Sequence, residues 1–297
     1  MPAVGSDSDR PLVSVVTPAY NEATRGFLPE TLASVSQQDY ERIEHVVVDD
    51  GSTDETPQLV REFEHDHELH LVRQENRGMT RAVNRGLKET NGDIVVWLNA
   101  DDVLPRRDAV DRVRSTFQSE PETDFVYGSH AFLRPDGMVK QVKVPYPWPT
   151  HKRLLLSNFA IIVFADGDTF RSLGLNTKYR HVSDRELYLR ASSRGATFTH
   201  VPDLLYGHRE HKERKTEQVS DEMAAESKQI LEKYGAGDIR HYDQQVRLLE
   251  LQLDALQMLG LGHFLELHRH PEEFVDAVGL GSLRSAVTRQ LLTCVPG

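Results

Sequence analysis

Three stretches of the chain decide its fold class, because each joins a short apolar run to a polar turn. They read LVSVVTPAYNE at 12–22, HVVVDDGSTD at 45–54 and IVVWLNADD at 94–102. Apolar runs of this length that end in turn-forming residues are typical of buried strands. The first strand is expected to end at Pro18.

Helices are expected between these strands. Residues 29–37 and 57–66 each begin with a proline, which suits the first turn of a helix. Residues 79–90 end at Asn91-Gly92, which is a helix stop signal. Further strands are expected at 69–73 and 125–127, with a hairpin turn at 135–137. Further helices are expected at 108–118 and 184–194. Thr56 and Asp108 are candidate N-caps of the helices that begin near residues 57 and 108. Strands that alternate with helices predict the α/β class, with a mostly parallel central sheet flanked by helices.

The polar turns at 18–22, 49–54 and 99–102 all follow strands of this predicted sheet. In open parallel sheets, ligands bind outside the carboxyl ends of the strands. These three turns are therefore the candidate functional site.

Composition limits the class of protein. The chain has 297 residues and a formal net charge of −11, which argues against nucleic acid as a partner, because nucleic-acid binding needs a positive surface. Its one cysteine, Cys294, can form neither an internal disulfide nor a cysteine metal cluster, so a cytoplasmic location is expected. Residues 1–10 are polar, and no apolar run reaches the ~20 residues of a membrane helix. We expect at most a peripheral attachment at the inner membrane face.

Two pairs of adjacent aspartates follow strands. Asp101 and Asp102 repel each other and are costly to desolvate unless a divalent cation binds them; a solvated turn is the alternative. Asp49 and Asp50 either form an Asp-Gly turn or offer a carboxylate to a base N–H or a ribose hydroxyl. Tyr20 either flanks a nucleobase or is an ordinary aromatic at a strand end.

In order and spacing, these motifs resemble the family 2 glycosyltransferases of the GT-A fold. The residues that carry the resemblance are VSVVTPAYNE at 13–22, VDDGSTD at 48–54, ENRG at 75–78, AVNRGL at 82–87, GDI at 92–94 and WLNADD at 97–102. The resemblance is strong from about residue 11 to 130 and weaker to about 216. It implies an inverting transfer of a sugar from a nucleoside-diphosphate sugar to a hydroxyl group of a glycan, lipid-linked or small-molecule acceptor.

The resemblance also implies roles for single residues. The implied donor-binding residues are Pro18, Ala19, Tyr20, Glu22, Asp50, Arg81, Asn99 and Asp101. Asn99 occupies the first position of a DXD-like stretch, where the family has aspartate. Asp102 is implied as a ligand of Mg²⁺ or Mn²⁺ together with His211, with His208 as the alternative histidine. The basic run of Lys212, Arg214 and Lys215 would meet phosphates or solvent.

Asp184 is implied as the general base. It stands in SDRELYLR at 183–190, which resembles the family's Glu-Asp-x-x-Leu-x-x-Arg segment, with Ser183 where glutamate is common. A role as a helix N-cap is equally consistent with the sequence. Glu186 is the nearest rival, but two positions further along a helix it points to a different face.

The expected domain organisation has three parts. Residues 1–10 are a disordered start, and residues 11–215 form the GT-A domain, with a donor-binding half at 11–125 and an acceptor half at 126–215. Residues 216–297 form a helical C-terminal extension, whose stretch 239–259 carries an apolar stripe of Val246, Leu249, Leu253 and Leu256. We expect this extension to mediate homo-oligomerisation or surface attachment; packing on its own domain is the alternative.

Two other functions fit parts of the sequence. A non-catalytic nucleotide-sugar-binding or scaffold protein on the same fold would be expected to lack Asp184 or His211, and both are present. A nucleotidyltransferase would need a glycine-rich, basic loop after the first strand, where this chain has Pro-Ala-Tyr-Asn-Glu.

Overall fold

The computed structural model describes residues 10–64, 67–145, 151–156, 162–211 and 220–235. The described strands are β1 (Val13–Ala19), β2 (Ile43–Asp49), β3 (Glu68–Arg73), β4 (Ile94–Trp97), β5 (Phe125–Leu133), β6 (Val139–Lys143), β7 (Phe164–Asp166) and β8 (Phe198–Arg209). The described helices are α1 (Leu28–Ser36), α2 (Thr56–Glu62), α3 (Met79–Glu89), α4 (Ala109–Ser119), α5 (His151–Leu156), α6 (Gly167–Leu173), α7 (Ser183–Ser193) and α9 (Ser220–Lys233).

Several sequence-based expectations fall outside these residues. They are the disordered start up to residue 9, the basic run of Lys212, Arg214 and Lys215, the stripe of Val246, Leu249, Leu253 and Leu256, and Cys294.

The described strands form an eight-stranded sheet in the order β3-β2-β1-β4-β7-β5-β6, with β8 paired to β5. β1 to β4 are parallel, which confirms the α/β class. Beyond β4 the sheet is mixed, since β7 runs antiparallel to both β4 and β5, β6 antiparallel to β5, and β8 parallel to β5. The antiparallel pair β5–β6 is the hairpin expected at 135–137.

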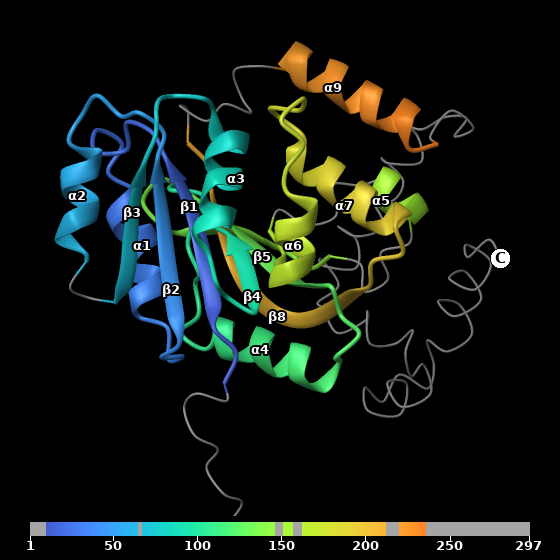
Figure 1. The fold of residues 1–297 in the computed structure, drawn as a ribbon, viewed down its shortest axis with the longest axis horizontal. Helices are drawn as coiled ribbons and strands as arrows, with labels where there is room; N and C mark the ends of the chain where they lie inside the picture. The colour runs from blue at the N-terminus through green and yellow to red at the C-terminus, as the bar shows by residue number, and fades with distance from the viewer. Residues whose placement is uncertain (1–9, 65–66, 146–150, 157–161, 212–219, 236–297) are drawn as a thin grey trace, which may run out of the picture. The chain divides into compact units, whose positions relative to one another are not determined.

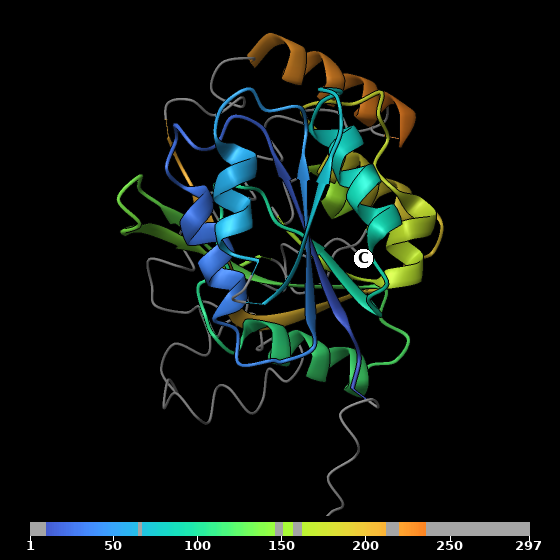
Figure 2. The ribbon, with the colours of Figure 1, turned by 60° about the vertical axis from the view of Figure 1, so that its left-hand side comes forward.

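Helices cover both faces of the sheet. Figure 2 shows the layers edge-on, with α1 and α2 (blue) to the left of the strands and α3, α6 and α7 (teal to yellow) to the right. Side chains of β1 alternate between the two cores: Val13 and Val15 pack with α1 and α4, whereas Val16 packs with α3 and α7. α3 lies especially close to β1, since a Cβ on Gly86 would come within 2.4 Å of Val16. Every residue of β1 is buried as a result.

Pro18 does not end the first strand, contrary to the expectation from sequence. β1 continues through Ala19, and Pro18 pairs in register with Val48 of β2. The carbonyl of Ala19 accepts from the N–H of Asp50 on the β2 side, so the nitrogen of Pro18 faces the β4 side. The pairing of β1 with β4 stops at Val16 and Trp97, and therefore no ladder bond is lost at the proline.

Neither expected N-cap forms a cap hydrogen bond with its side chain, although Asp108 does occupy the N-cap position of α4. Thr56 is the first helical residue of α2, and its hydroxyl accepts from the N–H groups of Glu22 (2.7 Å) and Ala23 (3.0 Å) instead. Asp108 precedes α4 without a cap bond, because its carboxylate binds the guanidinium groups of Arg106 and Arg112 at 2.8 and 2.7 Å. Charged donors give stronger hydrogen bonds than the backbone N–H groups of a helix start.

Helix α9 lies in the stretch assigned from sequence to a C-terminal extension, yet it packs against α7 (Figure 1). Its Ile230 is fully buried in the same core as Leu187 and Leu189 of α7. All described residues belong to one compact unit. The division of the chain at residue 215 stays a prediction. No helix in the described part of the chain is long and apolar enough to cross a membrane.

Candidate functional site

The turns after β1 and β2 are locked together by one asparagine. Asn21 adopts a φ of 53°, which asparagine tolerates better than most residues. In this conformation its Oδ1 accepts from the N–H of Thr53 at 2.9 Å, and its own N–H donates to Ser52 Oγ at 2.9 Å. The first two predicted site segments therefore form one surface.

Asp50 shapes the loop that leads into α3. Its carboxylate accepts from the side chain of Gln74 (2.7 Å) and from the N–H groups of Arg77 and Gly78 (both 2.8 Å). The loop passes so close that a Cβ on Gly51 would lie 2.6 Å from the nitrogen of Asn76. A carboxylate has about four acceptor sites, so roughly one is left for a ligand. Asp50 is thus first a support of the loop and second a candidate contact to a base.

The remaining predicted donor contacts of this half differ in exposure. Tyr20 is exposed and able to stack on a planar ligand, whereas Pro18 and Ala19 are buried and offer only main-chain groups. Arg81 is exposed on the first turn of α3, where its guanidinium reaches the carbonyl of Arg77 at 3.4 Å. An exposed cation at this helix start is suited to a phosphorylated ligand.

Glu22 is buried with half of its carboxylate unpaired. Oε1 accepts from Arg25 at 2.8 Å, but Oε2 has no hydrogen-bond partner among the described residues. Burial raises the pKa of Glu22 to about 7, helped by the charge of Asp101 and opposed by Arg25 and His211. Burial therefore favours the protonated form of a second acid, close enough to Asp101 to feel its charge.

Asp101 and His211 form the pair in the site that best fits a metal ion. His211 Nε2 lies 3.0 Å from Asp101 Oδ2, although the residues are 110 positions apart. Two adjacent ligands of an octahedral ion at about 2.1 Å would themselves lie about 3.0 Å apart. The imidazole of His211 also packs on Phe27, with ring centroids 4.8 Å apart, so its orientation is fixed. The donor set suits a divalent cation that accepts oxygen and imidazole ligands.

Asp102 has a different environment. It is fully buried, and Asn99 Nδ2 (2.9 Å) and the hydroxyl of Tyr206 both donate to its Oδ2. Its Oδ1 accepts from the N–H of Arg209 at 2.9 Å and lies 3.4 Å from Nδ1 of His208. Protein donors therefore surround the carboxylate that the resemblance implies as the metal ligand. Asp102 ties the turn after β4 to β8, and this geometry favours Asp101 over Asp102 as the ligand.

Asp184 lies in the first turn of α7 and is not its N-cap, which is Val182. Burial raises the pKa of the Asp184 carboxyl, while the N–H of Arg185 and the charges of Arg185 and His208 act in the opposite direction. The interaction with His208 is informative, because His208 also neighbours Asp102. The structure thus brings Asp184 to the same end of β8 as the acidic turn.

Glu186 faces away from this site. Its carboxylate binds Arg190 (3.0 Å), Lys233 (3.1 Å) and the hydroxyl of Tyr234 (2.7 Å), so it joins α7 to the end of α9. Fully buried and fully paired, Glu186 has a structural role.

Sequence reasoning missed the residues that connect the two halves of the site. Arg209 is almost fully buried; its guanidinium stacks on Phe27 at 5.0 Å, pairs with Glu30 and donates to the carbonyl of Asp101 at 3.1 Å. Tyr206 likewise reaches Asp102 from β8. Tyr206 lies 104 positions from Asp102, and Arg209 lies 179 positions from Glu30, so no local pattern marks them.

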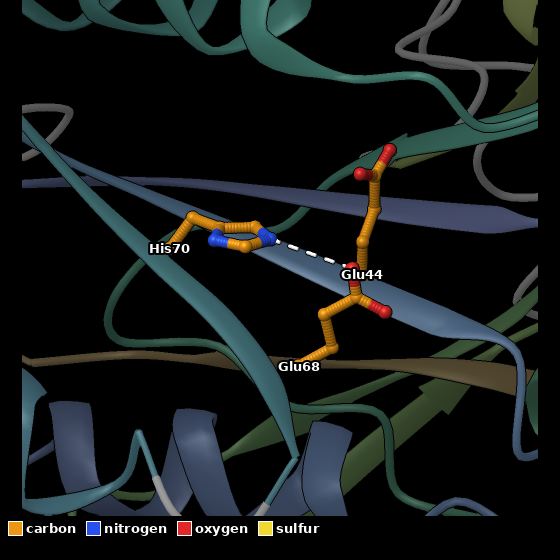
Figure 3. Close-up of side chains that lie close together, drawn as sticks. All are labelled: Glu44, Glu68 and His70. Carbon is orange, nitrogen blue, oxygen red and sulfur yellow. Dashed lines mark ion pairs between the residues drawn. The ribbon is translucent and has the colours of Figure 1, made fainter.

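Another group with metal-ligand chemistry, Glu44, Glu68 and His70, lies elsewhere (Figure 3). These residues stand near the amino ends of β2 and β3, roughly 15 Å or more along the strands from the site. Glu44 Oε1 already accepts from Ser14 Oγ and from the N–H groups of Asn91 and Gly92, at 2.5 to 3.0 Å. This group therefore does not serve the site described above.

Comparison with known proteins agrees with this geometry. The sequence profile of "Glycosyl transferase family 2" matches residues 14–150. O-antigen biosynthesis protein RfbC of Myxococcus xanthus is 31% identical over 217 residues, which are 70% of this chain and 16% of that protein. The chain spans half or less of the length of the curated relatives it matches.

Two solved structures share the fold. TarS of S. aureus, residues 1–349 in complex with UDP-GlcNAc, has a TM-score of 0.63 at 20% identity, over 79% of this chain and 70% of that one. Mannosyltransferase PcManGT of Pyrobaculum calidifontis, in complex with GDP-Man and Mn²⁺, has a TM-score of 0.57 at 23% identity, over 96% of this chain and 84% of that one. Sequence profile, fold and the arrangement of the strand-end turns agree, and the chain belongs to the family 2 glycosyltransferases with the GT-A fold.

Proposed function

We propose that this protein is a metal-dependent, inverting glycosyltransferase that moves a sugar from a nucleoside-diphosphate sugar to a hydroxyl acceptor. The observation that carries the proposal is the approach of His211 to Asp101, 3.0 Å apart, at the strand end where Asp184 also lies near His208. The complexes of the structural relatives with UDP-GlcNAc and with GDP-Man and Mn²⁺ support this class of donor and cation. The name of the RfbC relative supports a role in polysaccharide biosynthesis.

The aspartate that we assign to the cation is Asp101, whereas the resemblance implies the next residue, Asp102. We assign Asp101 and His211 as the protein ligands of Mg²⁺ or Mn²⁺, because the carboxylate of Asp102 is already surrounded by protein donors. A bound divalent cation would neutralise charge on the leaving diphosphate. The Oε2 atom of Glu22 has no hydrogen-bond partner among the described residues, so this carboxylate could interact with the charge of the bound cation.

Asp184 is the proposed general base. A carboxylate with a raised pKa is a stronger base than an ordinary aspartate. It would take the proton of the acceptor hydroxyl as that oxygen bonds to the anomeric carbon and the bond to the diphosphate breaks. Inversion requires the base and the leaving group on opposite sides of the sugar, which fits a base on α7 and a cation site on the turn after β4.

The test compares Asp101→Asn with the matched variant Asp102→Asn. Mn²⁺ binding by calorimetry, and Mn²⁺-dependent hydrolysis of UDP-GlcNAc and GDP-mannose, are measured for both. We expect Asp101→Asn to lower Mn²⁺ affinity at least about tenfold in a stably folded protein, because it removes a charged ligand. Asp102→Asn should mainly lower stability, by roughly 1–3 kcal/mol, because buried donors lose a charged acceptor.

If Asp102→Asn abolishes Mn²⁺ binding at full stability while Asp101→Asn binds normally, the ligand assignment is reversed. A non-catalytic binding protein is the rival function. It predicts donor binding without hydrolysis or transfer, and without any effect of Asp184→Asn. Cytoplasmic location, peripheral membrane attachment and homo-oligomerisation through the C-terminal helices stay predictions.

A further inference from the structure

Four ring side chains form a strip on the face of β5 and β8 next to the proposed base. His130 and Phe132 of β5 stand in register with Tyr206 and His208 of β8. The ring centroids of His130 and Phe132 lie 5.4 Å apart, as do those of Phe132 and His208. Since His208 interacts with both Asp102 and Asp184, this ring strip begins at the catalytic end of β8.

His130 is a buried polar group that the protein leaves unpaired. Its residue is 6% exposed, and its Nδ1 has no hydrogen-bond partner in the described part of the chain. Burial lowers the pKa of His130 to about 3, with smaller contributions from His208 and Lys143, so the ring is neutral at physiological pH. An unpaired buried polar atom costs about 1–3 kcal/mol, and a ligand hydroxyl would remove that cost.

Lys143 places a cation beside the strip. It stands opposite His130 on β6, in the hairpin that projects from the left of the body in Figure 2, and its Nζ lies 5.3 Å from the centre of the Phe132 ring. Among the described residues it has no carboxylate partner. Lys140 of the same strand differs, because it pairs with Glu210 at 2.6 Å. A cation, an apolar ring and an imidazole are thus grouped on one face.

We propose that His130, Phe132 and Lys143 form a subsite for an anionic glycan acceptor. A sugar ring would lie on Phe132, one of its hydroxyls would bind His130, and its carboxylate or phosphate would pair with Lys143. The subsite rests on the proposed function for its relation to Asp184. It goes beyond that function because it proposes that the acceptor is anionic and names the residues that bind it.

The chemistry of each group matches its part. Phe132 is half-buried and offers a ring face, and the apolar faces of sugars pack on such surfaces while their hydroxyls seek placed polar groups. The protein carries a net charge of −11, so an anion is repelled from most of its surface and needs a local cation. Lys143, which meets no carboxylate in the described part of the chain, is such a cation.

The experiment titrates the full-length protein with methyl β-D-glucuronide, sn-glycerol 3-phosphate and neutral methyl β-D-glucoside. The histidine ring signals are followed by NMR, with that of His130 assigned from a His130→Phe variant. We expect saturable shifts of the His130 signal with at least one anionic ligand, and at least about threefold weaker binding of the glucoside. Glucuronide alone identifies a carboxylate acceptor and glycerol phosphate alone a phosphate acceptor.

Matched variants separate a subsite from general charge effects. Lys143→Gln should lower the affinity for the anionic ligand about threefold to fivefold, whereas Lys140→Gln, on the same strand, should leave it unchanged. His130→Phe should weaken binding about twofold to tenfold without lowering the melting temperature, because it removes an unpaired polar atom and keeps a ring. A structural role would give the opposite pattern, with lost stability and unchanged binding.

The proposal is overturned if no anionic ligand shifts the His130 signal, or if the two lysine variants behave alike. Hydrolysis of UDP-GlcNAc and GDP-mannose with Mn²⁺ is measured in parallel without acceptor. If no donor is hydrolysed while anionic ligands still bind as described, the proposed function fails and the subsite stands. If donors are hydrolysed and anionic ligands do not bind, the subsite alone fails.

Discussion

Replacing Glu22 by glutamine should stabilise the metal-free protein at alkaline pH. Burial raises the pKa of Glu22 from 4.5 to about 7, so the folded state keeps its proton at pH values where the unfolded state has lost it. The protonated side chain therefore makes its whole contribution to the free energy of unfolding below pH 4.5. This contribution falls as the pH rises from 4.5 to about 7, and above about pH 7 it no longer changes. At about 1.4 kcal/mol per pH unit, the interval corresponds to about 3 kcal/mol.

The assay is urea unfolding of wild type and Glu22→Gln at pH 4.5, 6 and 8 in EDTA. We expect the variant's advantage in unfolding free energy to grow by about 3 kcal/mol from the lowest to the highest pH. Glu75→Gln serves as control, because Glu75 is 88% exposed at its side chain and should give no such trend. An advantage of Glu22→Gln that does not change with pH would refute the reasoning.

Two further predictions concern the site, and a third concerns the contact between α7 and α9. Asp184→Asn should lower sugar transfer by about 10²–10⁴-fold while donor and Mn²⁺ binding persist. Because burial raises the pKa of Asp184, the transfer rate of the wild type should decline on acidification at a higher pH than an ordinary aspartate would give. Initial rates measured as a function of pH test both expectations. Asp50→Ala should weaken donor binding by roughly 1–3 kcal/mol and also lower the melting temperature, since the loop at 74–78 loses its acceptor; calorimetry and thermal unfolding would show either effect missing. Lys233→Met should destabilise the fold by roughly 1–3 kcal/mol in urea unfolding, because Glu186 is buried, and an unchanged midpoint would mean that α9 does not hold α7.

The fold class was predictable because its signals are local. Each apolar run of β1, β2 and β4 is followed by its own turn residues. Pro29 and Pro57 lie in the first turns of α1 and α2, and α3 ends shortly before Gly92. These features depend on a few neighbouring residues, so the sequence alone is enough to predict them. The errors at Pro18 and Thr56 arose where a partner from a distant segment altered the local preference, as the shortened pairing with β4 did for Pro18. At Asp108 the cap bond is lost to two nearby side chains, those of Arg106 and Arg112.

The candidate site was predictable only as a set of segments. The sequence alone determined that acids and turn formers end neighbouring parallel strands, because strand direction brings those ends to one edge of a sheet. It did not determine which acid of the pair the donors of β8 would surround and which would meet a histidine. Only the tertiary structure decided that, since β8 returns more than one hundred positions later and places Tyr206 and the N–H of Arg209 on Asp102, and His211 on Asp101. A carboxylate's role depends on which donors reach it, and those donors are set by packing between distant segments rather than by neighbours in the chain.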